Sequence, residues 1–299
     1  LATNTSSTSG TPNKIVFTDT TNAPLASGSN NAGFFFGGTN YARYDAGGYM
    51  RATVYGTDSN ANATLSGTAV TTLGTIDATK DVQFSGAAAA TSTASGAQSA
   101  VTNLLVADGT AFKVGQAISG TNITANTFIT AISGNTLTLN QATGSVANGA
   151  VITPYNLVSA QTTGDVNTLN LSGNGASLRL GAAQTLSVNG ILRSGGTTNI
   201  VSVISGGTGI QSASSGGEMV VRTNAAADTL QIATPILANG ASSLTKSGAG
   251  TLIITGANSY TGVTTINDGT LSNFASSTST SGWAPAALQA PSTRSRSTG

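Results

Sequence analysis

The sequence predicts an all-β chain folded as a right-handed parallel β-helix that carries a small inserted all-β module. Short apolar segments alternate with polar residues from Asp165 to Leu271, which is the periodicity of strands. The turns between them are rich in Gly and Asn, which tolerate the left-handed corners of a coil. Thr, Ser and Asn recur near strand ends, where stacked coils can form ladders of like residues. Sandwiches and up-and-down barrels also contain short, evenly spaced strands, but a rhythm sustained this long favours a solenoid.

The composition narrows the range of functions. Only 7% of the residues are charged and the net charge is +1, so no long-range field directs the chain to nucleic acid or to an anionic membrane. The chain has no cysteine and no histidine, which removes disulfides, thiolate zinc sites and the commonest general acid or base. No apolar run approaches the ~20 residues that a membrane helix needs. We therefore expect no cofactor, no metal and no nucleic acid partner.

We expect residues 1–100 to form an N-terminal aromatic-rich cap and the first coils of the solenoid. An aromatic cluster with two arginines could be a platform for a carbohydrate or a protein partner, because aromatic faces stack on sugars and arginine pairs with carboxylates. The same cluster could instead cover the unpaired strand edges of the first coil, and this is the interpretation we favour. The candidate platform comprises Phe34, Phe35, Phe36, Tyr41, Arg43, Tyr44, Tyr49 and Arg51.

Three further segments complete the expected organisation. Residues 86–100 form a low-complexity Ala/Ser/Thr link, and residues 101–153 resemble a small all-β module of bacterial surface and phage tail proteins. We expect this module to be inserted in the solenoid and to protrude from its side. Residues 154–271 should form the main parallel β-helix. Residues 272–299 lose the strand rhythm and are interpreted as a linker or disordered tail.

The segment 244–271, LTKSGAGTLIITGANSYTGVTTINDGTL, resembles the autotransporter-associated β-strand repeat found in type V secretion passengers. In this segment Leu252 and Ile254 lie two apart and share one face of a strand, and Tyr260 can cover the edge of the coil. The positions that carry the resemblance are Lys246, Gly248, Gly250, Thr251, Leu252, Ile254, Gly256, Asn258, Tyr260, Gly262, Thr264, Thr265, Ile266, Gly269, Thr270 and Leu271.

The resemblance implies a passenger that crosses the outer membrane of a Gram-negative-type bacterium and remains extracellular or at the cell surface. It also implies that coils stack stepwise outside the cell and so oppose back-sliding. The sequence contains no recognisable signal peptide and no alternating membrane strands of a barrel. We therefore expect a translocator barrel in the full-length protein.

Catalysis has little support in the sequence. A glycosidase needs two carboxylates that face each other across a sugar, and the closest acidic pair, Asp77 and Asp81, flanks Lys80 in a predicted turn. Arg179, Arg193 and Arg222 lie in the solenoid and could line a substrate groove. The chain has no calcium loop of the DxDxDG type and no glycine–aspartate nonapeptide. We therefore expect no catalytic, cofactor-binding or metal-binding residue.

The leading hypothesis is a structural or adhesive surface protein, an adhesin-like stalk that contacts extracellular surfaces, glycans or copies of itself. One alternative is a polysaccharide-active enzyme on the same scaffold. Another is a self-assembling extracellular filament subunit, because the ends of a solenoid are open strand edges.

Overall fold

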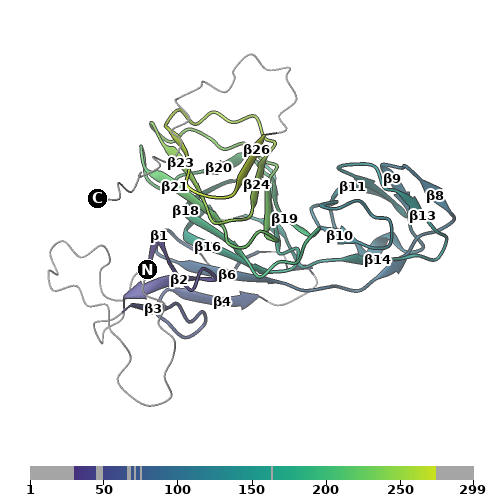
Figure 1. Cartoon of the computed structure of the whole chain (residues 1–299), viewed down its shortest axis with the longest axis horizontal. Coiled ribbons are helices and arrows are strands. Elements are labelled where there is room, and N and C mark those ends of the chain that lie inside the picture. The colour runs from purple at the N-terminus through teal and green to yellow at the C-terminus, as the bar shows by residue number, and fades with distance from the viewer. Residues whose placement is uncertain are drawn as a thin grey trace, which may run out of the picture.

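A computed structural model shows the chain as an elongated β structure with a lateral projection (Figure 1). The structure describes residues 30–44, 50–65, 69–70, 72–74, 76–162 and 164–273. Within these residues the regular structure is β, apart from one short 3-10 turn, η1 (Gly109–Ala111). The predicted all-β class is therefore confirmed.

Two parallel sheets form the solenoid, and the chain alternates between them. Sheet I contains, in spatial order, β4 (Ala61–Leu65), β6 (Asp81–Gly86), β16 (Asp165–Gly173), β18 (Thr185–Ser194), β21 (Glu218–Thr223), β23 (Ser243–Ser247) and β25 (Thr264–Ile266), with β20 (Gly209–Gln211) also paired to β18. Sheet II contains β5 (Ala69–Val70), β15 (Leu157–Gln161), β17 (Ser177–Leu180), β19 (Val201–Gly206), β22 (Thr229–Ile232), β24 (Thr251–Ile254) and β26 (Thr270–Asn273). One strand from each sheet makes a coil, as expected for a parallel β-helix.

The core lies between the two sheets and consists of apolar columns that run from coil to coil. In sheet II, Leu178 pairs with Ile204, Ile204 with Ile232, and Ile232 with Ile254. All four side chains are buried. Because side chains alternate across a strand, one parallel register keeps every member of the column on the inner face. Each buried aliphatic side chain contributes about 1.5–3 kcal/mol, and no coil could bury its face without its neighbours.

The inserted module leaves the solenoid after β6 and returns at β15. Its strands pair antiparallel throughout: β7 (Ser92–Thr93), β8 (Gln98–Ser99), β9 (Asn103–Leu105), β10 (Ile118–Ser119), β11 (Ile129–Ser133), β12 (Thr136–Leu139), β13 (Ser145–Val146) and β14 (Val151–Pro154). It has its own core, which includes Leu104, Phe112, Ile129, Leu137 and Ile152. The module projects to one side of the solenoid (Figure 1), and the expected inserted β module is present.

The module begins before the predicted boundary at residue 101. β7 and β8 lie within residues 86–100, which the sequence assigned to a link, and they pair with β14 and β13. Both strands consist of Ser, Thr and Gln, so they carry no apolar alternation. Their pairing depends on partners about fifty residues away, which local periodicity does not report.

The module also packs against the outer face of sheet II. Phe128 and Tyr155 form a small buried cluster with Val201 and Val203, which project outward from β19. The backbone N–H of Asn126 donates to the carbonyl oxygen of Asn199 at 3.0 Å. The module therefore has a fixed position on the solenoid.

The N-terminal strands β1 (Asn30–Phe36), β2 (Asn40–Tyr44) and β3 (Met50–Ala52) form an antiparallel sheet, here called the N-terminal hairpin sheet. It lies along the outer face of sheet I, against β16, β18 and β21, whereas the expected cap was a cover for the unpaired strand edges of the first coil. Leu192 gives the physical reason: it pairs with Asn170 and Arg222 on the outward side of sheet I, yet it is fully buried. A leucine on the outer face of a sheet is buried only if another part of the chain covers that face, and here the N-terminal hairpin sheet covers it. The predicted tail beyond residue 273 lies outside the described residues.

Candidate functional site

The segment that carries the family resemblance forms β23, β24, β25 and β26, and so contributes twice to each sheet. Lys246, on β23, is paired with Val221 on one side and Ile266 on the other. Leu244 is two residues away and belongs to the hydrophobic core, so alternation directs the lysine side chain to the same interior. Lys246 is fully buried.

The Lys246 ammonium connects two successive coils. Its Nζ donates to the carbonyl oxygens of Ser247 at 2.9 Å and Gly248 at 2.6 Å, which form the corner of its own coil, and to that of Asp268 at 3.0 Å, in the next coil. Burial lowers the pKa of Lys246 to about 8, while the charge of Asp268 acts to raise it. Charge-assisted hydrogen bonds to three carbonyls offset part of the cost of burying the ammonium.

Glycines occur where adjacent coils of the repeat approach most closely. Gly248 has φ +75° and Gly269 has φ +72°, a region that side chains with a Cβ enter at a cost. A Cβ at Gly248 would lie 2.2 Å from the carbonyl oxygen of Thr223, in the preceding coil. A Cβ at each of the other repeat glycines would also lie within 2.5 Å of a backbone oxygen of a preceding coil: these are Gly250, Gly256, Gly262 and Gly269.

The remaining signature residues join the coils through side chains. Asn258 Oδ1 accepts from the backbone N–H of Ile236, in the preceding coil, at 2.9 Å. Tyr260 packs partly buried against the solenoid core, and its hydroxyl lies 2.9 Å from the Thr264 hydroxyl. The rest take part in the two parallel ladders: Thr251, Leu252, Ile254, Thr264, Thr265, Ile266, Thr270 and Leu271. The repeat signature thus describes the contacts between stacked coils.

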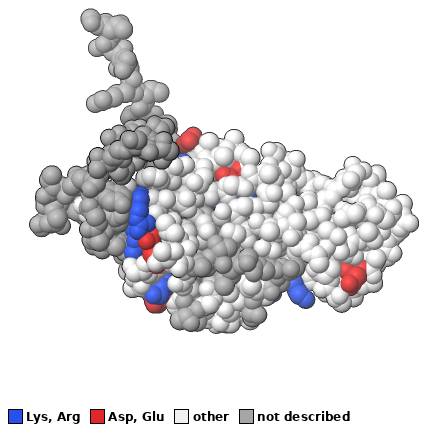
Figure 2. All heavy atoms as spheres, turned by 90° about the horizontal axis from the view of Figure 1, so that it is seen from below, with Lys and Arg blue, Asp and Glu red and all other residues white. Residues whose placement is uncertain are grey.

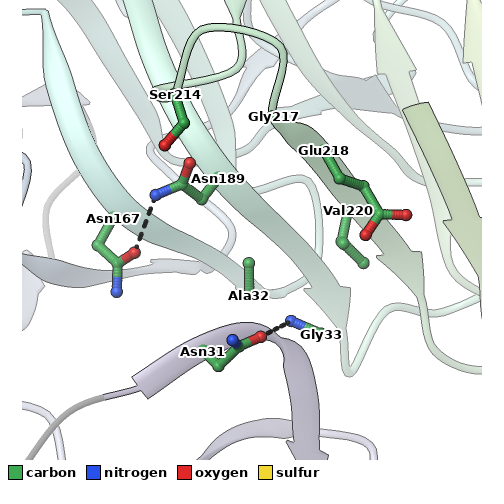
Figure 3. A pocket seen from close by; sticks show the side chains of 9 residues that line it. All are labelled: Asn31, Ala32, Gly33, Asn167, Asn189, Ser214, Gly217, Glu218 and Val220. Atoms are coloured by element: carbon green, nitrogen blue, oxygen red, sulfur yellow. Dashed lines mark hydrogen bonds between the residues drawn. The ribbon is translucent and has the colours of Figure 1, made fainter. Parts of the chain in front are cut away.

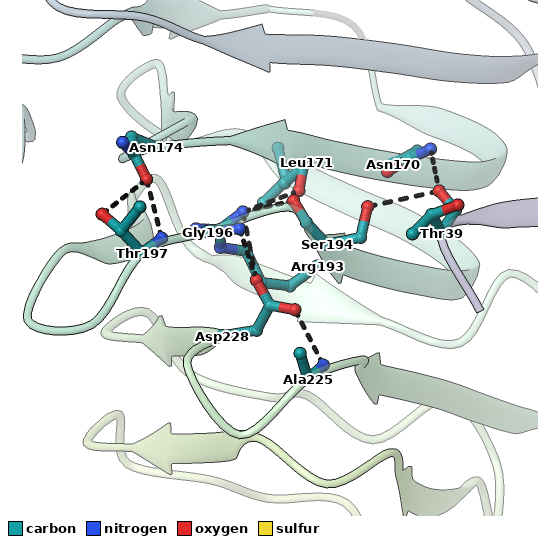
Figure 4. Close-up of polar contacts among 10 residues, drawn as sticks. All are labelled: Thr39, Asn170, Leu171, Asn174, Arg193, Ser194, Gly196, Thr197, Ala225 and Asp228. Carbon is teal, nitrogen blue, oxygen red and sulfur yellow. Dashed lines mark hydrogen bonds and ion pairs between the residues drawn. The ribbon is translucent and has the colours of Figure 1, made fainter.

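A second buried cation, Arg193, lies at the end of an earlier strand of sheet I (Figure 4). Arg193, fully buried at the end of β18, donates from Nη1 to the carbonyl oxygens of Ser194 at 2.7 Å and Leu171 at 3.3 Å. The same Nη1 lies 3.7 Å from Oδ1 of the buried Asp228. Burial lowers the pKa of Arg193 to about 10, and the Asp228 charge acts against that shift. The sequence indicated only that Arg193 could line a groove and did not reveal this role, although its position two residues after Ile191 signals an inward side chain.

Asp228 also connects two coils, in this case as an acceptor of hydrogen bonds. Its Oδ1 accepts from the backbone N–H of Gly196 at 2.7 Å, and its Oδ2 accepts from that of Ala225 at 2.8 Å. Both carboxylate oxygens are therefore engaged, and Figure 4 shows the side chain directed at the corner that follows Arg193. Arg193 and Asp228 form a corner pair that neither strand rhythm nor motif spacing revealed.

The other two arginines of the suggested groove lie elsewhere. The Arg222 guanidinium stands 5.0 Å from the centre of the Phe35 ring, in cation–π contact with the N-terminal hairpin sheet. Arg179 lies beside Gly115, in the inserted module. The three arginines do not converge on one groove.

The aromatic residues of the candidate platform are largely turned toward the protein. Tyr41, Arg43 and Tyr44 are buried, Phe35 packs 5.2 Å from the Tyr41 ring, and Phe34 is 38% exposed. Phe36 is half-buried, Arg51 pairs with Asp58 at 2.5 Å, and Tyr49 lies outside the described residues. These residues hold the hairpin sheet together and against the solenoid instead of presenting one flat aromatic face.

Asp81 is a buried acid whose position sequence reasoning did not reveal. Its Oδ1 accepts from the Thr168 hydroxyl at 2.6 Å and from Asn167 Nδ2 at 2.9 Å. Burial raises the pKa of Asp81 to about 6, while the two hydrogen bonds act to lower it. Asp77, its neighbour in the sequence, is exposed and accepts from Thr79. The two carboxylates do not face a common site.

Among the described residues, no group of three or more acidic side chains is placed to hold a metal ion. The same residues include no helix of the length and hydropathy required to span a membrane.

Comparison with known proteins gives one match. Residues 244–272 match the family model of the passenger-associated-transport-repeat. No curated protein and no solved structure matches the chain significantly. The matched segment contains Lys246, Asn258 and the glycines that lie at the contacts between successive coils. With this repeat built into a parallel β-solenoid, the chain fits part of an autotransporter passenger.

Proposed function

We propose that this chain is an extracellular, surface-exposed β-solenoid passenger with a structural and adhesive role and no catalytic activity. The observation that carries the proposal is the buried Lys246 ammonium, which donates to carbonyl oxygens of two successive coils within the matched repeat. This arrangement favours a function in ordered stacking. It offers no acid, base or nucleophile to a substrate.

Stacking can support export through an outer membrane translocator. Each new coil adds a parallel strand to both sheets and places its apolar residues on those of the coil before it. Coil addition is favourable only next to a folded coil, because a single coil leaves its inner face exposed. A folded stack outside the cell is wider than the extended chain that passed through the translocator, so it cannot pass back through it. Folding therefore opposes backward movement. We assign this step to the repeat at residues 244–272.

The arrangement of charges supports a role without catalysis. The described carboxylates mostly serve local structure: Asp77 and Asp108 accept from the following Thr79 and Thr110, and Asp58 pairs with Arg51. Charged atoms occupy a few separate spots on the surface seen in Figure 2. Such a surface suits a neutral stalk that holds the module and the hairpin sheet away from the cell.

The test is display of the chain on Gram-negative cells behind a type V translocator, with surface exposure measured by antibody binding and protease digestion of intact cells. Lys246→Met should reduce the exposed, protease-resistant fraction several-fold. Lys113→Met, at an exposed lysine of the module, is the matched control and should leave it unchanged. Equal display of the wild type and Lys246→Met would contradict the assigned role of the repeat. Failure of the wild type to reach the surface would contradict the passenger function itself.

A further inference from the structure

A groove lies between the N-terminal hairpin sheet and the outer face of sheet I (Figure 3). Its volume is about 300 Å³, at the lower end of the roughly 300–1,000 Å³ typical of small-molecule sites. One wall is β1, and the other is formed by β16, β18 and the start of β21. The lining residues are Asn31, Ala32, Gly33, Asn167, Asn189, Ser214, Gly217, Glu218 and Val220.

The groove depends on close contact between two parts of the chain that are distant in sequence. A Cβ at Gly190 on β18 would lie 2.8 Å from Cβ of Ala32 and from the Tyr41 hydroxyl. The missing side chain lets β1 approach the solenoid. The Ser194 hydroxyl also donates to the carbonyl oxygen of Thr39 at 3.2 Å, next to β2. Both walls are thus held in place before any ligand arrives, which lowers the entropy cost of binding.

The amides on the sheet I wall form an ordered chain. Asn189 Nδ2 donates to Asn167 Oδ1 at 3.2 Å, and Asn167 Nδ2 donates to the buried Asp81 carboxylate at 2.9 Å. Asn167 and Asn189 occupy adjacent coils, so this is a ladder of like residues. The orientation of each amide is set by Asp81, and the Asn189 carbonyl oxygen faces the groove beside Ser214 (Figure 3). The wall therefore presents a positioned acceptor.

The opposite end of the groove supplies a carboxylate. Glu218 lines the groove and is exposed, and its Oε1 accepts from the Thr245 hydroxyl on the neighbouring β23; Figure 3 shows its carboxylate at the rim, turned away from Asn189. A carboxylate accepts strongly from hydroxyl groups. Glu218 is the one charged residue among those that line the groove, so an anionic ligand would meet repulsion without a compensating cation. The lining favours a neutral ligand with several hydroxyl groups.

The remaining lining residues fit the same ligand. Gly33 and Gly217 add backbone groups without side-chain bulk, and Ala32 and Val220 offer small apolar contacts. A pyranose presents both hydroxyls and C–H faces, and this combination of amide, carboxylate and small apolar groups suits it. We propose that the groove binds a neutral sugar unit of an extracellular glycan. This inference gives the adhesive part of the proposed function a site, and it does not depend on the route of export.

The purified full chain tests the inference on an array of neutral and anionic glycans, with the best neutral glycan then titrated by calorimetry. The wild type should bind neutral glycans in preference to sialylated or sulfated ones. Glu218→Gln keeps an acceptor for Thr245 but removes the charge, and Asn189→Asp places a second carboxylate beside the ladder. Each should weaken binding about tenfold or more, because each alters a hydrogen bond to the sugar.

Asn103→Asp, at an exposed position of β9 in the module, is the matched control and should bind as the wild type does. Circular dichroism and thermal melting establish that each variant is folded. The proposal is overturned if no neutral glycan binds, if anionic glycans bind more tightly, or if Glu218→Gln and Asn189→Asp bind like the control. None of these outcomes bears on surface display, so a failure here is distinguishable from a failure of the passenger function.

Discussion

Lys246 Nζ donates a hydrogen bond of 3.0 Å to the carbonyl oxygen of Asp268, although the two residues belong to different coils. The same ammonium binds two carbonyls of its own corner. One side chain therefore fixes the distance and the register between a coil and its successor. The matched repeat contains both residues.

Replacement of Lys246 by methionine should lower the free energy of unfolding by about 2 kcal/mol. Methionine fills a similar volume but removes the donor from three carbonyl oxygens, of which that of Gly248 is buried and those of Ser247 and Asp268 are partly buried, and a buried group without its partner carries a desolvation cost. Burial of the ammonium, which lowers the pKa of Lys246, offsets part of the stabilisation that these hydrogen bonds provide. We therefore expect a loss smaller than the sum of three desolvation costs of about 1–3 kcal/mol each. Chemical denaturation measures it. Lys113→Met should change the value by less than about 0.5 kcal/mol, and an equal effect of both variants would contradict the role of Lys246.

Gly248→Ala should destabilise the chain more than Gly216→Ala. Both glycines have positive φ, +75° and +68°, so both substitutions carry a cost of about 1–2 kcal/mol for the left-handed conformation. A Cβ at Gly216 meets nothing within 4 Å, whereas one at Gly248 would lie 2.2 Å from the Thr223 carbonyl oxygen. The additional drop in melting temperature of Gly248→Ala relative to Gly216→Ala therefore reports the contact between coils. Equal melting temperatures would mean that coils are not in close contact at Gly248.

Arg193 and Asp228 should show strong coupling in a double-mutant cycle. Both are fully buried, with 3.7 Å between Nη1 and Oδ1. Removal of one partner leaves a buried charge uncompensated, so Arg193→Met or Asp228→Asn alone should cost about 3–5 kcal/mol. The double variant should be less destabilised than the sum, with a coupling energy of about 1–3 kcal/mol. Additive effects in denaturant titrations would show that the two side chains act independently.

Asp81 should make the stability depend on pH between about 4 and 6. Its pKa is raised from 3.8 to about 6, so within this interval the folded chain binds more protons than the unfolded chain at this site. The contribution of Asp81 is therefore most favourable below about pH 4 and is lost as pH rises through 6. The stability difference between the wild type and Asp81→Asn should shift against the wild type as pH rises across this interval, in parallel denaturation series. A difference that stays constant from pH 4 to 7 would contradict the raised pKa.

The sequence predicted the parts of the fold that depend on local rhythm. Leu252 and Ile254, two residues apart between glycine corners, indicated a stacked strand, and both side chains lie in the core. The repeat resemblance was confirmed over residues 244–272. These features are encoded within one or two coils, where apolar period and turn residues suffice.

The parts that depend on distant partners were not predictable in the same way. β7 and β8 carry no apolar alternation, and the N-terminal hairpin sheet is placed by Leu192 and Gly190, more than a hundred residues away from it in sequence. The sequence offered Arg193 only as a possible groove residue and placed Asp81 in a turn beside Lys80, because composition reports charge and not the side of a strand on which a charge lies. Alternation from Ile191 could have placed Arg193 inside. The neighbours of Asp81 on β16 could not be known without the register.

The most direct test of the account is cross-linking of adjacent coils through cysteines, because the chain has none of its own. Thr229 on β22 pairs with Thr251 on β24 in the parallel register, and both side chains are partly exposed. Oxidation of the variant with cysteine at both positions should give an intramolecular disulfide in high yield, and a variant with cysteines at 229 and 255 should give little. An antiparallel arrangement of β22 and β24 would reverse the two yields, and that result would contradict the stacked solenoid on which the passenger assignment depends.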